Sequence, residues 1–461
     1  MGVSRFMRIL LVAAALIAPF SKFASADSIT SALEAVYLGN PRLNAKRMSV
    51  RAAREEICQA EAGLRPNVGI VATVAREYYS LLSLYTGNYF GTPYSVQSIY
   101  KAPDWSETVS LNAAQLLFDG SQTAHTIDVA KYFLTSTQAM LRSLEQQLLL
   151  ATATAYMDYL RASADLVVKR DNVTWHRALV RQLRDKMGIK DTNQTDVAQA
   201  EATLAAAEGE VSKAEMKALE ASAEYRRLVG REPLSITPAE VIDRRLPPSL
   251  KAAIELGLRQ SPDIEAALLN ARISHTRVRI VEGALLPVAT LQVSLQQSHF
   301  DSPIITQEAR SASATVQVTA PIFQGGTEYA EIRRRKEIYS RDLFTTLDIR
   351  DKAIATITDA WDQFAIAKSE IDSSVEQVNA ERVALDGVRA EIRLKFRTIA
   401  ELLHAGQRLL DARLQLLTAQ HDRIVASYSL MSATGTLTAS TLGLNVPIWK
   451  VTSTCDHPFD H

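Results

Sequence analysis

The sequence predicts a mainly α-helical protein with a small β part, built from two tandem copies of one plan. The first observation behind this prediction is internal repetition at constant offsets. Pro41 returns as Pro262, 221 positions later, and Gly230 returns as Gly435, 205 positions later. The second observation is a pair of very long stretches without proline, and the third is a set of short segments that alternate apolar and polar residues. Offsets that stay constant over long stretches indicate a tandem duplication.

Each copy contains four kinds of segment in the same order: a helix, two strands, a long helix and a final helix. The long stretch covers about 68 residues in each copy, which as a continuous helix measures roughly 100 Å. Apolar residues within it recur at steps of three and four, the pattern of a packed helical seam. The predicted helices are 28–63, 121–187 and 194–229 in the first copy, and 250–285, 327–395 and 399–433 in the second.

The four predicted strands decide the architecture. Residues 289–296 and 312–320 alternate strictly, whereas 68–74 and 108–113 alternate less regularly. Small barrels filled by side chains need about eight strands, and open sheet edges are not tolerated in lipid. Several chains are therefore expected to pool their strands. The loop between the first two strands, residues 80–104, is rich in turn formers and aromatic residues and is expected to face the outside of the cell.

The N-terminus predicts secretion. Arg5 and Arg8 precede the apolar run 9–18, and Ala24-Ser25-Ala26 supplies a small-residue cleavage site, so cleavage is expected after Ala26. An apolar run of this length is too short for a membrane anchor, which needs about 20 residues. The predicted organisation is a signal peptide at 1–26, a first repeat at 27–237, a second repeat at 238–445 and a tail at 446–461.

Composition excludes several classes of function. The 51 Lys and Arg balance 51 Asp and Glu, so the basic excess of a nucleic-acid-binding protein is missing. Phosphate-binding, dinucleotide-binding and hydrolase signatures are absent from the sequence, so no enzymatic activity and no cofactor are expected. Cys58 is expected to be buried in a helix. Four residues of the tail have side chains of types that bind metals, but we expect a frayed terminus that holds no metal. They are Cys455, Asp456, His457 and His461.

Several motifs resemble the TolC-like outer membrane efflux family over nearly the whole mature chain. They are Asn40-Pro41, Ala153-Thr154-Ala155-Tyr156, Gln194-Thr195-Asp196-Val197, Ala284-Leu285-Leu286-Pro287 and Pro321-Ile322-Phe323-Gln324-Gly325-Gly326. The resemblance implies a homotrimer with a shared 12-strand β-barrel in the outer membrane of a Gram-negative bacterium, in contact with outer-membrane lipid. It also implies an α-barrel tunnel through the periplasm that meets a periplasmic adaptor and an inner-membrane ABC or proton-driven transporter.

The segment 434–444 resembles family members that serve type I secretion, which favours protein export over drug efflux. The exported substrate is not indicated. An alternative is a soluble periplasmic coiled-coil adaptor or scaffold without a barrel. The alternating strands favour an outer-membrane channel, because a soluble adaptor does not need hairpins whose apolar and polar residues alternate at every second position.

The resemblance also implies where the tunnel closes, at the turn around residues 393–405. Lys395 stands where family members commonly carry glycine. Glu401 and His404 match two aspartates that form narrow acidic rings in the family, and Arg397 and Thr398 keep the family pattern. Asp196 occupies the equivalent turn in the first copy. Glu401 and His404 are three residues apart, so they share one helix face. Spacing alone favours a solvated helix end, and the family resemblance reverses this preference. Arg397 can donate a forked pair of hydrogen bonds, and Asp196 is its expected candidate partner.

Overall fold

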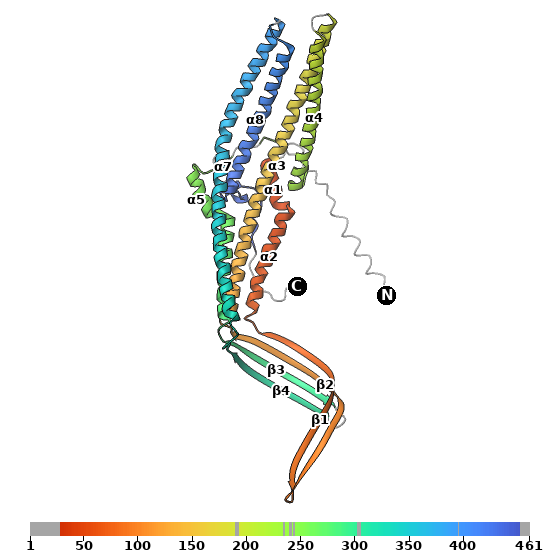
Figure 1. The fold of residues 1–461 in the computed structure, drawn as a ribbon, viewed down its shortest axis with the longest axis vertical. Coiled ribbons are helices and arrows are strands. Elements are labelled where there is room, and N and C mark those ends of the chain that lie inside the picture. The colour runs from red at the N-terminus through yellow and green to blue at the C-terminus, as the bar shows by residue number, and fades with distance from the viewer. Residues whose placement is uncertain are drawn as a thin grey trace, which may run out of the picture. The chain divides into compact units, whose positions relative to one another are not determined.

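The computed structural model describes residues 28–189, 193–233, 236–238, 242, 245–301, 306–394 and 396–451. The predicted signal peptide at 1–26, Lys395 and the four tail residues Cys455, Asp456, His457 and His461 lie outside the described residues. The described chain is mainly helical and contains one four-stranded sheet, which confirms the predicted fold class (Figure 1).

The two halves of the chain repeat one order of elements, namely two short helices, two strands, a very long helix and a shorter helix. Both long helices contain 67 residues. A four-residue helix, α9 (Ala439–Leu442), ends the series. The first half holds α1 (Ile29–Gly39), α2 (Pro41–Ala62), β1 (Asn67–Tyr89), β2 (Thr92–Phe118), α3 (Gln122–Gly188) and α4 (Gln194–Val229). The second holds α5 (Leu250–Gln260), α6 (Pro262–Gly283), β3 (Val288–Asp301), β4 (Thr306–Thr319), α7 (Thr327–Arg393) and α8 (Ile399–Ala433).

The prediction of one continuous helix at the start of each copy was wrong. The helix breaks before Pro41 in the first half and before Pro262 in the second, because a residue that precedes proline is disfavoured in the helical region. Asn40 makes use of the break. Its side-chain oxygen accepts from the Arg42 backbone N–H at 3.0 Å, and its amide nitrogen donates to the Leu228 carbonyl at 3.3 Å, which ties the break to the end of α4.

The four strands form one antiparallel sheet in the order β1-β2-β3-β4. The prediction of a loop at residues 80–104 was wrong, because β1 and β2 continue through this region as paired strands. A tight turn at Phe90 and Gly91, both with positive φ of 49° and 84°, closes the hairpin. The many aromatic and β-branched residues there are typical of strands, and they outweigh the scattered turn formers that suggested a loop.

The chain divides into two compact units. Within the described residues, the helical unit comprises 28–44, 143–261 and 353–449, and the sheet unit comprises 45–142, 262–352 and 450–451. None of the helices within the described residues combines the length and the hydropathy of a membrane-spanning segment.

The core of the helical unit contains large aromatic and aliphatic side chains. Tyr156 of α3 and Tyr225 of α4 are fully buried, with ring centroids 6.3 Å apart. The Tyr156 hydroxyl donates to the Thr237 carbonyl at 2.6 Å, so its polar end is satisfied. Ile357 of α7 and Leu430 of α8 pack in a second buried cluster with Ala253 of α5 and Ala360.

In the sheet unit, two glycines allow close backbone approach where strands meet helices. A Cβ on Gly120 would lie 2.3 Å from the Gly283 carbonyl oxygen, and a Cβ on Gly283 would lie 2.6 Å from the Gly120 carbonyl oxygen. Gly120 also has a φ of 67°, which favours glycine. Cys58 lies on α2 in this unit and is half-buried, less enclosed than the sequence predicted.

Candidate functional site

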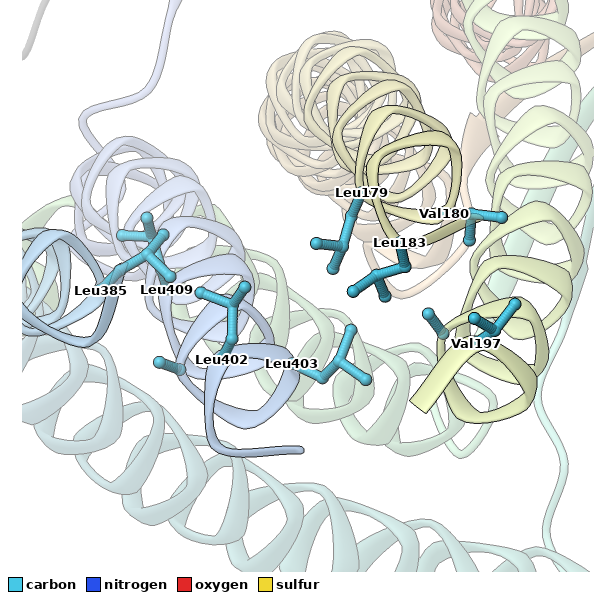
Figure 2. Close-up of a cluster of buried hydrophobic side chains, with 10 residues drawn as sticks. Leu179, Val180, Leu183, Val197, Leu385, Leu402, Leu403 and Leu409 are labelled. Carbon is cyan, nitrogen blue, oxygen red and sulfur yellow. The ribbon is translucent and has the colours of Figure 1, made fainter. Parts of the chain in front are cut away.

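The ends of four helices in the helical unit meet at one hydrophobic cluster (Figure 2). The last turns of α3 and α7 and the first turns of α4 and α8 contribute to it. Leu183 of α3 and Leu403 of α8 are turned toward the same space. The buried members are Leu179, Val180, Leu183, Val197, Ala200, Leu385, Leu402, Leu403, Ala405 and Leu409. This packing places the α3–α4 turn and the α7–α8 turn at the same end of the helical unit.

Arg397 links the end of α7 to the start of α8. Its Nε donates to Glu391 Oε2 at 2.8 Å, and its Nη1 donates to Glu401 Oε1 at 2.7 Å. These two hydrogen bonds raise the pKa of the Arg397 guanidinium above its usual range. The fork therefore spans the turn between the two helices and holds two carboxylates at once.

Thr398 and Glu401 form a capping box at the start of α8. The Glu401 backbone N–H donates to Thr398 Oγ1 at 3.3 Å, and the Thr398 backbone N–H donates to Glu401 Oε2 at 2.8 Å. That backbone hydrogen bond and the Arg397 side chain lower the pKa of Glu401 to about 2. Glu401 is therefore ionised at any physiological pH, and its charge is partly balanced by Arg397.

The expected partnership between Arg397 and Asp196 was wrong for the single chain. Among the described residues, the hydrogen-bond partners of Arg397 are Glu391 and Glu401. Asp196 lies in the first turn of α4, where its backbone N–H donates to Asn193 Oδ1 at 2.8 Å. The sequence did not reveal Glu391 as a partner, because the six-residue separation spans a turn whose path no residue pattern predicts.

His404 lies one turn further along α8, exposed on the same face as Glu401. It lines a cavity of about 400 Å³ between α3, α4 and α8. Polar side chains from the other two helices face this cavity, including His176 of α3 and Gln199 of α4. Burial lowers the pKa of His176, and its Nδ1 has no hydrogen-bond partner among the described residues. These lining residues were missed, because each stands alone on its own helix and forms no motif.

The five predicted site residues therefore fall into two groups. Arg397, Thr398 and Glu401 form one hydrogen-bonded assembly, whereas His404 and Asp196 lie apart from it on α8 and α4. Nowhere in the described part of the chain do three or more His, Cys, Asp or Glu side chains gather as metal ligands.

The sheet has two chemically different faces. Because neighbouring residues on a strand point to opposite faces, the register assigns each row of residues to one of them. One row joins Ile70, Leu111, Leu295 and Ala312 across the four strands. Further exposed residues on this apolar face are Val68, Val74, Val109, Val293, Val316 and Val318.

The opposite face is polar. One row joins Gly69, Asn112, Ser294 and Ser313. The Ser294 hydroxyl donates to Asn112 Oδ1 at 2.8 Å, and the Asn112 amide donates to Ser110 Oγ at 3.0 Å. Further polar residues on this face are Thr73, Thr290, Gln292, Gln296, Ser311, Thr315 and Gln317. Such a sheet can separate an apolar phase from water.

Comparisons with known proteins agree with this geometry. The family described as "Outer membrane efflux protein" matches residues 32–231 and 253–436. The outer membrane efflux protein BepC of Brucella suis biovar 1 (strain 1330) is 31% identical over 427 residues, covering 93% of this chain and 89% of BepC. The outer membrane protein TolC of Escherichia coli (strain K12) is 21% identical over 457 residues, covering 94% and 88%.

A solved structure has the same fold. The outer membrane channel CmeC of Campylobacter jejuni superposes with a TM-score of 0.77 at 14% sequence identity, covering 88% of this chain and 85% of CmeC.

Proposed function

The chain belongs to the outer membrane efflux protein family, and on this premise we propose that it is the outer-membrane channel of a tripartite export system. The observation that carries the proposal is the sheet with one apolar and one polar face. Its apolar face fits lipid and its polar face fits a water-filled lumen. The paired long helices of the helical unit fit a tunnel wall that guides substrate across the periplasm.

The proposal includes assembly as a homotrimer. In the four-stranded sheet, β1 and β4 are the outer strands. Lipid does not tolerate open sheet edges, so β1 of one copy pairs with β4 of the next. Three copies then share a barrel of 12 strands. We propose the same localisation as the sequence suggested, the outer membrane of a Gram-negative bacterium, with the signal peptide removed after Ala26.

Partners follow from the same proposal. A passive duct needs an energised transporter in the inner membrane and an adaptor that joins the two, and we assign the duct itself no catalytic chemistry. The likeness of segment 434–444 to type I secretion members favours an ABC transporter and a protein substrate. We do not retain the soluble coiled-coil adaptor, because exposed residues such as Ile70 and Val318 on the apolar sheet face have no role in water.

We further propose that the α7–α8 turn is the periplasmic constriction. Arg397 ties α7 to α8 through Glu391 and Glu401, and Thr398 caps α8, so this turn is rigid in the closed state. Glu401, His404 and Asp196 are then near the narrowest part of the passage. The hydrogen-bonded group of Glu391, Arg397 and Glu401 carries one net negative charge, and its carboxylates favour cations at the constriction.

Conductance of the purified oligomer in a planar bilayer tests both proposals. The native protein should form discrete channels, and its failure to conduct would contradict the channel itself. Arg397→Ala should raise the resting conductance, because it releases α7 from α8. Arg408→Ala is the matched control, since it removes the same charge and an ion pair between α8 and Glu381 of α7, at 3.0 Å, away from the turn. Equal conductance in the two variants would place the constriction elsewhere.

A further inference from the structure

The first hairpin of the sheet is much longer than the second. β2 begins to pair with β3 at Trp105 and Asp301, and β3 pairs with β4 up to the same level, at Asp301 and Thr306. Beyond this level, β1 and β2 pair with each other within the described residues as far as Tyr89 and Thr92. We call residues 77–104 the distal hairpin. It continues past the ends of β3 and β4 and bends away from them (Figure 1).

The composition of the distal hairpin is unusual for a segment in water. Lys101 is the one charged residue between Tyr78 and Pro103. Side chains that are large, apolar and exposed in the single chain include Phe90, 94% exposed, and Tyr89, 69% exposed. The aromatic residues are Tyr78, Tyr79, Tyr85, Tyr89, Phe90, Tyr94 and Tyr100. Soluble surfaces rarely leave so large an apolar patch uncovered.

The distal hairpin distributes its apolar residues differently from the sheet below it. On the face that continues the apolar face of the sheet, Leu82, Leu84 and Ile99 lie among the polar residues Ser80, Thr86 and Gln97. On the face that continues the polar face of the sheet, the register places Tyr85, Tyr89, Tyr94 and Val96, and the rings of Tyr85 and Tyr94 lie 6.3 Å apart. A strand with lipid on one side and water on the other would be polar on this second face. The distal hairpin therefore needs an apolar contact on the face that continues the polar face of the sheet.

We propose that the distal hairpins of neighbouring copies pack against one another over the outer mouth of the barrel and form its lid. The inference rests on the proposed trimeric channel. In that channel β1 is the strand at the seam between copies, so each distal hairpin continues directly from a seam. β4 begins at Thr306, at the level of Arg76 and Trp105. The part of β1 beyond this level therefore has no strand of the neighbouring copy to pair with at the seam.

The composition of the distal hairpin indicates that another copy of this chain, rather than lipid, covers its apolar residues. Anionic lipid headgroups are bound by clusters of Lys and Arg, and the distal hairpin has Lys101 alone. Identical apolar faces brought to one axis can cover each other. Each arm of the distal hairpin holds about 13 residues, or roughly 40 Å of strand. This exceeds the roughly 25 Å height of the apolar band of an outer-membrane barrel, so the distal hairpin is a substantial structure in its own right.

Cross-linking between copies tests the contact. In a background of Cys58→Ser and Cys455→Ser, Thr86→Cys places one thiol on an exposed position of the distal hairpin, and Ser311→Cys places one on the polar face of β4 as the control. A short bismaleimide should join the Thr86→Cys copies into covalent dimers and trimers and leave the Ser311→Cys copies single. If Thr86→Cys reacts fully with a simple maleimide but forms no cross-links, the distal hairpins do not pack against one another and the proposed lid is wrong.

A shortened hairpin tests the function of the contact. Replacing residues 80–101 by Asn-Gly should at least double the bilayer conductance, while the oligomer persists on unheated gels as in the parent. If the parent and the variant conduct equally, the channel stands and the lid is wrong. If neither conducts, the proposed function itself fails. A third outcome also contradicts the lid. If Thr86→Cys forms no cross-links, and surface polysaccharide of full length is what blocks its labelling by maleimide on cells, then the distal hairpin binds a saccharide.

Discussion

His421 of α8 lies between two carboxylates, with its Nε2 3.0 Å from Asp158 Oδ1 of α3 and its Nδ1 2.7 Å from Asp422 Oδ1. The imidazole is 9% exposed. Burial lowers the pKa of His421, but the bonds to Asp158 and Asp422 outweigh it and raise the pKa overall. The contact with Asp158 is an ion pair without linear hydrogen-bond geometry. Two helices of the helical unit are thus joined by a titratable contact whose imidazole is buried and whose carboxylates are partly exposed.

The other charged groups around this contact act in both directions. Arg161 of α3 lies 3.4 Å from Asp158 and disfavours the charged imidazole. Asp165, one turn further along α3, has a pKa raised by burial, and Lys217 of α4 acts on it electrostatically. The bond to His421 lowers the pKa of Asp158. Both shifts favour the form of the pair in which His421 is an imidazolium and Asp158 a carboxylate.

The free energy of unfolding should fall as pH rises above neutrality. A raised folded-state pKa means that the contribution of His421 is complete below its unfolded value of about 6.5 and is lost as pH passes through the higher folded value. Asp158, whose pKa is lowered, loses its contribution only in acid. Guanidinium unfolding should give a lower free energy of unfolding at pH 9 than at pH 6.5. His421→Gln should remove this slope, and the exposed His404→Gln should keep it; a slope shared by all three proteins would contradict the assignment.

Gly406 of α8 should resist substitution. A Cβ at this position would lie 2.6 Å from the Trp175 ring of α3, next to the hydrophobic cluster at the helix ends. Gly406→Ala is expected to destabilise the protein by about 1–3 kcal/mol, the usual cost of overpacking. Gly209→Ala on α4 is the matched control, because nothing lies within 4 Å of its Cβ position and alanine favours the helix by about 1 kcal/mol. Chemical unfolding should therefore give changes of opposite sign, and equal stabilisation would show that α3 and α8 are not packed there.

His404 should influence the charge selectivity of the channel. It is exposed on the same face of α8 as Glu401, beside the proposed constriction. His404→Asp is expected to deepen cation selectivity, because it adds a carboxylate next to that of Glu401. Reversal potentials across a salt gradient measure the selectivity. His275→Asp, on α6 of the sheet unit and outside the proposed constriction, is the control; a matching change in that variant would remove His404 from the pore.

The sequence predicted the elements best where capping residues marked their ends. The predicted ranges of α4 and α8 agree with the structure, because Asn193 and Thr398 are N-caps and Gly230 is a left-handed C-cap. The sequence did not predict the break at Asn40, because the helical pattern of apolar residues continues on both sides of Pro41 and hides the effect of proline on the preceding residue.

The candidate site was harder to predict than the fold. The resemblance pointed to Arg397, Thr398 and Glu401, and the structure brings these three together. Glu391 and the residues around His404 were out of reach, because their partners come from the path of a turn and from other helices. The sequence predicted a loop for the distal hairpin, because Gly87, Asn88 and Pro93 resemble a cluster of turn residues. In the structure, Phe90 and Gly91 form the turn, and those three residues lie in the paired strands.

Two adjacent residues of β3 test most directly whether the sheet separates lipid from a water-filled passage. Val293 lies on the apolar face and Gln292 on the polar face. Val293→Arg should cost about 2–4 kcal/mol in the membrane and prevent recovery of the heat-resistant oligomer from outer membranes. Gln292→Arg should assemble normally and shift the channel's reversal potential toward anions. Assembly of both variants with unchanged selectivity, or failure of Gln292→Arg alone, would contradict the proposed channel.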